Sequence, residues 1–260
     1  RSQKVIDTIQ ALIDKKKNSA NSDKDVLSML IRAKDDDGTS FSNAELIGQT
    51  YLMFQAAHDT TSNTLTWTLF LLSQHPKVLK KLFDEIEKEF KGEIPNFEQI
   101  EKATYLEYIV KESMRIIPTS SFGAKKCKKT YKDGDLLIKE GSIVIVSPYM
   151  TQRIYEVYKD PKKFIPERWE TINPSNYEYC PFGVGSHACL GAKFAMIEMK
   201  LILTLIIQRY RFTLVPKSKI DRTFKITLFP KYGLPMYLSK QDGIFEQSEF
   251  SGNVKEMISF

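Results

Sequence analysis

A glycine-rich loop that presents a cysteine, followed at once by a helical pattern, constrains this chain most strongly. Residues 182–191 read Phe-Gly-Val-Gly-Ser-His-Ala-Cys-Leu-Gly. From Ala192 to Tyr210, apolar residues recur at the spacing of one helix face, which predicts a helix. Cys189 therefore lies at or just before a helix N-terminus, where unpaired N–H groups and the helix dipole favour the thiolate. The glycines of the loop allow tight turns and let a flat group approach the backbone.

The cysteine loop allows two interpretations. A lone cysteine is most often a buried free thiol. A thiolate held beside a flat group instead indicates the axial ligand of a haem iron. The full pattern favours the second interpretation, because it reads F-x-x-G-x-[R/H]-x-C-x-G and resembles the haem-binding loop of the cytochrome P450 superfamily. The matching residues are Phe182, Gly185, His187, Cys189 and Gly191.

A second motif lies in the middle of a long helical pattern. Residues 56–61 read Ala-Ala-His-Asp-Thr-Thr, and by themselves they fit the solvated face of an amphipathic helix. They also resemble the oxygen-activation motif [A/G]-G-x-[D/E]-T-[T/S] of the same superfamily. The resemblance implies that Thr60 hydrogen-bonds dioxygen and that Asp59 helps relay protons to it, a form of general acid assistance. Ala57 departs from the usual glycine, and its methyl group is expected either to narrow the groove over the haem or to alter the distortion of the helix.

A third motif pairs opposite charges on one helix face. Glu112 and Arg115 are three residues apart in the helix predicted over 104–117. Alone they fit an exposed ion pair worth under about 1 kcal/mol. They also resemble the E-x-x-R motif of the superfamily, and residues 166–169 (Pro-Glu-Arg-Trp) resemble its P-E-R-[F/W] segment. The resemblance implies a buried structural network of Glu112, Arg115 and Arg168 that fixes the segment supporting the cysteine loop.

The resemblance also implies which residues hold the cofactor, haem b. Cys189 is the expected axial ligand of the iron, and His187 is expected to contact a haem propionate. Lys125 falls where many members of the superfamily have a propionate-binding arginine, although the neighbouring Lys126 could serve instead. The expected cofactor-binding residues are Ala57, Lys125, Phe182, Gly183, His187 and Cys189.

A substrate pocket follows from the same resemblance. Its expected residues lie on the long helix, after the Glu112–Arg115 helix and at a later strand turn. Aromatic and small side chains mixed in this way suit an apolar substrate. The residues are Phe54, Ala57, Thr119, Ser120, Ser121, Phe122 and Phe229.

These motifs together predict a haem-thiolate monooxygenase that inserts one atom of O2 into an apolar organic substrate. The chain shows no flavin or iron–sulfur motif, so the electrons are expected from an external ferredoxin, flavodoxin or flavin reductase. A basic face around Arg153 and Lys193 is a candidate for docking this donor. Two alternatives stay open, a truncated or non-catalytic haem-binding remnant of the same family and a helical module without haem.

Composition excludes several other classes of protein. The chain has 260 residues and a net charge of +6, with no basic block interleaved with aromatic residues, so nucleic-acid binding is not expected. Three cysteines at unrelated spacings do not form a disulfide framework, which indicates a reducing compartment. No apolar run reaches the roughly 18 residues of a membrane span. We therefore expect a cytoplasmic protein, or one on the cytosolic face of a membrane if a missing N-terminal part carries an anchor.

The remaining patterns predict a mainly α fold with small β-sheets. Two amphipathic helices are expected within residues 1–35, separated by the polar stretch 15–25. Further helices are expected over 42–73, opened by a capping box, and over 76–90, 104–117 and 192–210. Short strands are expected at 136–138 and 143–146 around a turn, and at 226–229 and 234–238 around another.

The resemblance covers residues 1 to about 240 and matches the C-terminal part of a single cytochrome P450 haem domain. In that fold the haem lies between the long oxygen-activation helix and the cysteine loop. Residues 241–260 are expected to form a polar C-terminal tail. The chain begins with Arg1 inside a helical pattern, which predicts a fragment of a longer protein.

Overall fold

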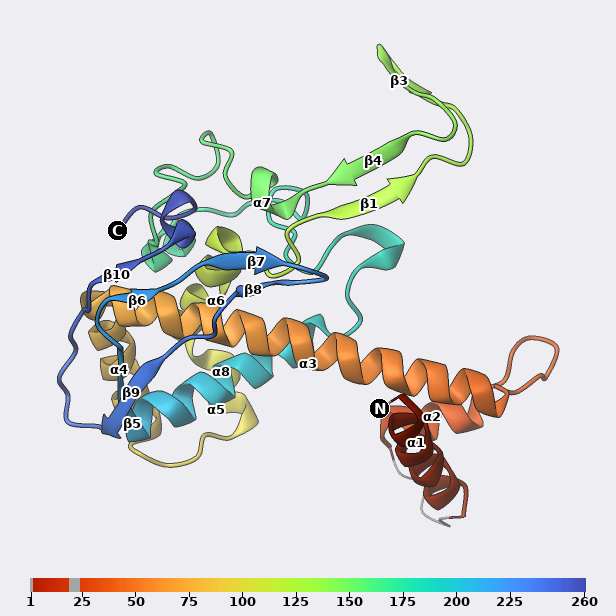
Figure 1. The fold of residues 1–260 in the computed structure, drawn as a ribbon, viewed down its shortest axis with the longest axis horizontal. Helices are drawn as coiled ribbons and strands as arrows, with labels where there is room; N and C mark the ends of the chain where they lie inside the picture. The colour runs from red at the N-terminus through yellow and green to blue at the C-terminus, as the bar shows by residue number, and fades with distance from the viewer. Residues whose placement is uncertain (1, 19–23) are drawn as a thin grey trace. The chain divides into compact units, whose positions relative to one another are not determined.

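The computed structural model describes residues 2–18 and 24–260, which form two compact units. The first unit extends to Asp59, and the second runs from Thr60 to the C-terminus. One long helix, α3 (Asn43–Gln74), contributes residues to both units (Figure 1). The order of the elements confirms a mainly α fold with small β-sheets.

The first unit contains α1 (Ser2–Lys17), α2 (Val26–Arg32) and the start of α3, and side-chain caps fix where α2 and α3 begin. Asp25 caps α2, because its side chain accepts the backbone N–H of Ser28 at 2.9 Å. The capping box of α3 is confirmed: Glu45 Oε2 accepts the Ser42 N–H at 2.8 Å, and Ser42 Oγ accepts the Glu45 N–H at 3.3 Å. The two expected helices are therefore present, and part of the polar stretch between them, residues 19–23, lies outside the described residues.

The second unit packs its helices around one apolar core. Side chains of α3, α4, α6 and α8 meet there, and Trp67, Phe70, Leu82, Ile109 and Leu203 are fully buried. The short helix α5, which periodicity does not reveal, begins with a capping box between Asn96 and Gln99. The helical elements are α4 (Pro76–Phe90), α5 (Phe97–Lys102), α6 (Thr104–Ile116), α7 (Pro148–Thr151) and α8 (Ala192–Arg209), with 3₁₀ turns η1 (Pro166–Glu170), η2 (Gly185–His187) and η3 (Asn253–Glu256).

Across residues 2–18 and 24–260, the strands pair two by two. Four pairs are antiparallel, and β6 with β10 is parallel. The pairs are β1 (Gly123–Lys126) with β4 (Ile143–Val146), β2 (Tyr131–Asp133) with β3 (Leu136–Ile138), β5 (Tyr210–Leu214) with β9 (Met236–Lys240), β7 (Arg222–Phe224) with β8 (Leu228–Pro230), and β6 (Ser218–Lys219) with β10 (Phe250–Ser251).

Strand pairing departs from the simplest expectation. The expected strands 136–138 and 143–146 are present, but they do not pair with each other across their turn. Instead Gly134, with φ +54°, opens a two-residue turn that joins β2 to β3. Strand β4 pairs with β1, and the Cys127 N–H extends their ladder by donating to Ser142 O at 2.8 Å. Similarly, β8 pairs with β7 and β9 pairs with β5.

The last residues pack against the second unit. Val254, Met257 and Ile258 are buried, although residues 241–260 have a polar composition. The Ile220 N–H donates to Ser251 O at 2.8 Å, and the Ser259 N–H donates to Lys162 O at 2.8 Å. These contacts join the C-terminal segment to both the strand region and the loop before η1.

In the part of the chain that the structure describes, no helix combines the length and apolar character needed to cross a membrane.

We expect the change Gly252→Ala to loosen the C-terminal segment. Gly252 has φ +119°, and a Cβ there would lie 2.2 Å from the backbone oxygen of Ile220. Backbone must move to relieve this overlap, so we expect a loss of roughly 3–5 kcal/mol in the free energy of unfolding. Urea denaturation followed by circular dichroism measures it.

The matched control for this change is Gly243→Ala. Gly243 also has positive φ, +75°, but a Cβ there would meet nothing within 4 Å. Only the backbone strain remains, about 1–2 kcal/mol. Equal losses in the two variants would contradict the steric explanation.

Candidate active site

The cysteine loop is closed by its own backbone. The Cys189 N–H donates to Phe182 O at 2.8 Å, and the Ala188 N–H donates to Gly185 O at 3.0 Å. Gly183 and Gly185 have φ of +72° and +73°, a conformation that favours glycine. The loop thus returns the chain to the start of α8 with Cys189 just before the helix, as the sequence predicts.

The three cysteines, all of which the structure describes, differ in exposure. Cys189 is exposed, Cys127 is half-buried and Cys180 is buried. Burial raises the pKa of the Cys180 thiol, which keeps it protonated. The Cys127 thiol donates to Lys129 O at 2.9 Å. Cys189 is therefore the thiol that is open to a ligand.

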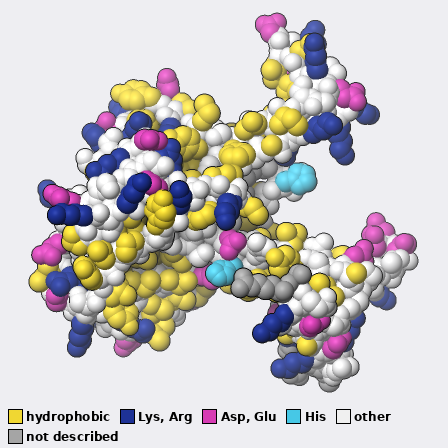
Figure 2. Space-filling model, in the orientation of Figure 1, with side chains coloured by type: hydrophobic (Ala, Val, Ile, Leu, Met, Phe, Trp, Pro, Cys, Tyr) yellow, Lys and Arg dark blue, Asp and Glu magenta, His cyan; other side chains and the backbone are white. Residues whose placement is uncertain are grey.

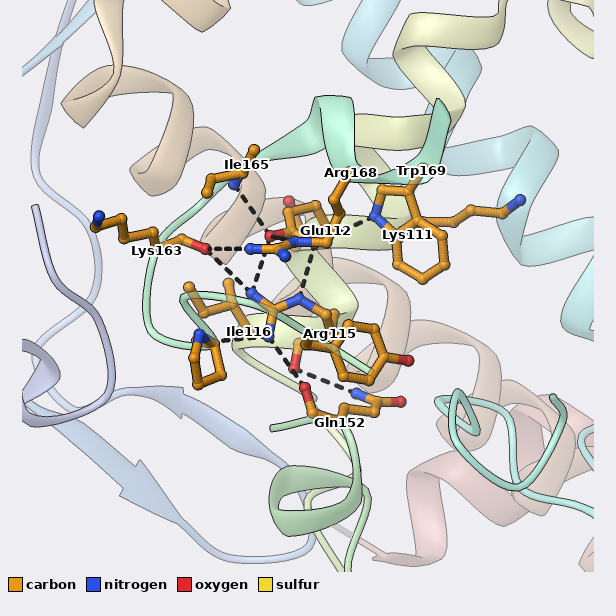
Figure 3. A network of polar contacts seen from close by, with 12 residues as sticks. Lys111, Glu112, Arg115, Ile116, Gln152, Lys163, Ile165, Arg168 and Trp169 are labelled. Carbon is orange, nitrogen blue, oxygen red and sulfur yellow. Dashed lines mark hydrogen bonds and ion pairs between the residues drawn. The ribbon is translucent and has the colours of Figure 1, made fainter. Parts of the chain in front are cut away.

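The carboxylate of Glu112 is the centre of a buried polar network (Figure 3). Arg115 binds it with two N–H groups, Nε to Oε2 at 2.8 Å and Nη2 to Oε1 at 2.9 Å. Arg168 Nε donates to Oε1 at 3.0 Å. Trp169 Nε1 donates to Oε2 at 3.1 Å, and the backbone N–H of Ile165 donates to Oε1 at 3.0 Å. The structure thus brings together the three residues expected from the E-x-x-R and P-E-R-W motifs, and it adds Trp169.

The network also fixes the loop before η1. Arg115 donates to the backbone oxygens of Gln152 at 3.0 Å, Pro161 at 2.9 Å and Lys163 at 3.1 Å. Arg168 Nη1 donates to Lys159 O at 2.7 Å. The remaining N–H groups of both guanidinium groups therefore bind backbone oxygens of the irregular segment that leads to η1.

Gln152, which no sequence motif indicated, connects this network to the cysteine loop. Its Nε2 donates to the backbone oxygens of Met114 at 3.0 Å and Arg115 at 3.2 Å. Its Oε1 accepts the N–H of Cys180 at 3.1 Å, and Cys180 O accepts the N–H of Gly183 at 3.0 Å. One buried amide thus joins the end of α6 to the first turn of the cysteine loop.

The segment after α6 is attached to α3. Thr64 Oγ1 and Thr119 Oγ1 are 2.8 Å apart, and Thr119 O accepts the Leu228 N–H at 2.9 Å. Trp67 Nε1 donates to Leu228 O at 3.0 Å, and Asn63 Nδ2 donates to Thr227 Oγ1 at 3.1 Å. These bonds hold the segment 118–122 and strand β8 beside the part of α3 that follows Thr60.

The expected substrate residues in the second unit surround these bonds. Ser121 Oγ donates to Pro118 O at 3.0 Å, and the rings of Phe122 and Phe224 lie 4.7 Å apart between centroids. Ser120 and Phe122 are exposed, and Phe229 on β8 is half-buried. The structure therefore attaches Thr119, and strand β8 with Phe229, to α3. The contact of Thr119 to Phe122 and of Phe229 with a substrate stays a prediction.

Three expected site residues lie on the part of α3 that belongs to the first unit. They are Phe54, Ala57 and Asp59, and all three are exposed. The ring of Phe54 meets that of His58 edge-on at 5.9 Å between centroids. Thr60, the next residue along the helix, is half-buried and begins the second unit. The roles of these residues toward a cofactor stay predictions.

The two candidate lysines lie side by side on β1. Lys125 is paired with Val144 and Lys126 with Ile143, and both lysines are exposed. Successive side chains of a strand point to opposite faces, so only one of the two can reach a given ligand. Figure 2 shows lysine and arginine side chains gathered on the projecting strand pairs β1–β4 and β2–β3.

The expectation of an exposed basic face at Arg153 is wrong. The Arg153 guanidinium lies 3.9 Å from the centre of the Tyr149 ring, and Nη1 donates to Tyr149 O at 3.0 Å. Burial lowers the pKa of Arg153 to about 10. Lys193, in contrast, is exposed and pairs with Glu101 at 3.1 Å. Its Nη2 also donates to Ile116 O, so the arginine ties α7 to the end of α6.

We expect Glu112→Gln to destabilise the protein strongly. The change leaves two buried guanidinium groups without their counter-charge, which costs roughly 3–5 kcal/mol in the free energy of unfolding. Asp84→Asn is the control, because the Lys80–Asp84 pair at 2.6 Å is more than half exposed and should change stability by less than about 0.5 kcal/mol. Urea denaturation compares the two, and a similar small loss in both would show that the network contributes nothing beyond a surface pair.

Comparisons with known proteins agree with this geometry. A family model described as "Cytochrome P450" matches residues 1–235. Cytochrome P450 3A29 of Sus scrofa is 32% identical over 206 residues, which cover 75% of this chain and 41% of that protein. Pentalenene oxygenase of Streptomyces avermitilis is 28% identical over 226 residues, which cover 86% of this chain and 50% of that protein.

A solved structure shows the same fold. The retinoic acid bound cyanobacterial CYP120A1 is similar with a TM-score of 0.84 and 28% sequence identity. The match covers 91% of this chain and 55% of that chain. The chain thus spans about half the length of the relatives it matches. On the family model, these relatives and the buried Glu112 network, the chain belongs to the cytochrome P450 family.

Proposed function

We propose that this chain supplies the thiolate side and the oxygen-activating helix of a haem-thiolate monooxygenase. The enzyme inserts one atom of O2 into an apolar organic substrate and takes its electrons from an external donor. The observation that carries the proposal is the exposed thiol of Cys189, held by a closed glycine loop before α8 in a chain of the cytochrome P450 family.

The donor set of the described residues fits haem better than a directly bound metal ion. Within residues 2–18 and 24–260, no group of three or more His, Cys, Asp or Glu side chains could hold a metal ion. Cys189 offers a single soft ligand. A porphyrin supplies four nitrogen ligands of its own, so that one protein thiolate completes the proximal side. The residues present therefore fit a haem with a cysteine axial ligand.

We assign the remaining contacts with haem b to residues of the cysteine loop and of β1. Phe182 and Gly183 open the loop, and His187 and Lys125 are exposed cations or hydrogen-bond donors suited to propionate groups. Gly191 lies beside the thiol and adds no side chain there, which leaves the backbone open to a flat ligand. When bound, haem supplies the electron transfer and the oxygen chemistry.

Asp59 and Thr60 are assigned to proton handling. The Thr60 hydroxyl can both donate and accept a hydrogen bond, and the Asp59 carboxylate can take a proton from water and pass it on. Asp59 is exposed, and Thr60, the next residue along α3, is half-buried. A positioned acid of this kind accelerates proton transfer by roughly 10²–10⁴-fold.

The proposed substrate is an apolar molecule of small to moderate size. Phe122 and Phe229 supply aromatic surface, Ser120 and Ser121 leave room, and Phe54 and Ala57 extend the set along α3. One solved relative holds retinoic acid. We propose a ferredoxin, flavodoxin or flavin reductase as donor, with Lys193 at its docking surface, and a location in the cytoplasm or on the cytosolic face of a membrane.

We expect Cys189→Ala to abolish thiolate ligation. The measurement is the absorbance spectrum of the haem-loaded, reduced chain under carbon monoxide. The unchanged chain should show a strongly red-shifted Soret band, because the thiolate pushes electron density onto the iron. The matched control Cys127→Ala should keep the band. A red-shifted band that survives Cys189→Ala would overturn the ligand assignment.

We expect Thr60→Ala to separate electron use from product formation. Loss of the hydroxyl removes a proton donor, so the fraction of electrons that appears in product should fall about tenfold or more. The readout is hydrogen peroxide released for each NADPH oxidised, with a surrogate ferredoxin and its reductase. Thr66→Ala is the control, because Thr66 Oγ1 donates to Ser62 O at 2.8 Å on the same helix. Unchanged coupling in Thr60→Ala would count against the proton role.

A further inference from the structure

Three threonines of the second unit form a continuous line of contacts. Thr64 Oγ1 lies 2.9 Å from the backbone oxygen of Thr60 and 2.8 Å from Thr119 Oγ1. Thr64 and Thr119 are 6% and 5% exposed, so water has little access to either hydroxyl. The line therefore runs from the segment after α6 to the turn of α3 that carries Thr60.

The direction of these hydrogen bonds follows from proton counting. A carbonyl oxygen has no proton, so at 2.9 Å the Thr64 hydroxyl must donate to Thr60 O. A hydroxyl has one proton and two lone pairs, so Thr64 Oγ1 can then only accept from its second neighbour. Thr119 Oγ1–H therefore donates to Thr64, and Thr64 Oγ1–H donates to Thr60 O.

The Thr60 carbonyl is consequently shared. In a regular helix the N–H of residue 64 also points at the oxygen of residue 60. A threonine hydroxyl on the same oxygen competes with that N–H and bends the helix locally. The shared carbonyl belongs to the residue to which we assign proton handling.

The far end of the line is firmly attached. Thr119 O accepts the Leu228 N–H at 2.9 Å, and Leu228 O accepts Trp67 Nε1 at 3.0 Å. Trp67 is fully buried in the core. A shift of the segment 118–122 would therefore stretch the hydrogen bond from Thr119 to Thr64. It would thereby also change the hydrogen bond that the Thr64 hydroxyl donates to Thr60 O.

We propose that Thr64 is a positioning residue that couples the segment Thr119–Phe122 to the backbone of Thr60. The inference rests on the proposed function, because it deepens the role assigned to Thr60 and to the substrate-facing segment. Thr64 touches neither substrate nor cofactor in this assignment. It sets the geometry of the α3 turn, and a ligand that presses on the segment alters that geometry through the two hydroxyl groups.

The helix contains its own control. Thr68 Oγ1 donates to Thr64 O at 2.8 Å, and Thr68 is 1% exposed. It thus makes the same bond one turn later and is at least as buried, but it lies one turn away from the contact with Thr119. Thr68→Val removes a buried hydroxyl of the same kind without removing the proposed coupling.

The first test is a double-mutant cycle on thermal unfolding of the chain, which does not depend on bound haem. Thr64→Val leaves the buried Thr119 hydroxyl without its acceptor, and Thr119→Val leaves Thr64 Oγ1 without the donor from which it accepts, so each change should lower Tm by about 2–4 °C. The double variant removes both hydroxyls and should lose clearly less than the sum. The matched cycle of Thr68→Val with Thr119→Val should be additive. An additive result for Thr64 with Thr119 would overturn the hydroxyl line.

The second test separates positioning from mere stability. With the apolar substrate that gives the largest Soret shift in a screen, Thr64→Val should release about 3–10-fold more hydrogen peroxide for each NADPH oxidised, the effect of one lost hydrogen bond. Substrate affinity should stay unchanged, Thr64→Ser should restore coupling, and Thr68→Val should not uncouple. Equal coupling in Thr64→Val and Thr68→Val would overturn the positioning role.

The two proposals fail in different ways. An unchanged chain that lacks the red-shifted Soret band defeats the proposed function, and with it the catalytic meaning of Thr64. A chain that shows the band and couples normally, but whose Thr64→Val variant behaves like Thr68→Val, defeats this inference alone. The unfolding cycle decides the hydrogen-bond line in either case.

Discussion

Five N–H groups converge on the buried carboxylate of Glu112, and much of the second unit depends on that convergence. Two come from Arg115 and one each from Arg168, Trp169 and the backbone of Ile165. Moving a carboxylate and two guanidinium groups out of water is costly, and only close, multiple hydrogen bonds offset that cost. The arrangement is therefore all-or-none, since a missing member leaves an uncompensated buried charge. It specifies one position for η1 relative to α6.

Irregular chain becomes an ordered support through this network. The guanidinium donors bind backbone oxygens of Pro161 and Lys163, and Gln152 carries the connection on to Cys180 and the first turn of the cysteine loop. The glycine loop can then hold Cys189 exposed just before α8. A second set of bonds, through Thr64, Thr119 and Trp67, fixes the segment after α6 to α3. Helix α6 thus carries Glu112 and Arg115 of the network and leads directly into the segment 118–122.

Local signals predicted the helices well because they act within a few residues. The Ser42–Glu45 capping box, the helix from Pro76 to Phe90 and the helix after Cys189 depend on side chains near their own backbone. Strand partners were harder to predict from the sequence. The strand over 143–146 was expected, but its partner β1 lies at Gly123–Lys126, beyond the nearer strands β2 and β3. Trp169 stood inside the P-E-R-W segment, so a signal for it existed. Gln152 had none, because the partners of its side chain, Met114, Arg115 and Cys180, are distant in sequence.

The sequence by itself determined the family, the cysteine before a helix, and the identity of the charged residues that meet. Motif spacing carries that information, because each motif is a local requirement on residue type. Only the tertiary structure decided that Arg153 faces inward, that Gln152 bridges α6 to the cysteine loop, and that Thr64 lies between Thr60 and Thr119. These are contacts between segments far apart in the chain. Their formation depends on burial and hydrogen-bond satisfaction across the whole core, which no local pattern records.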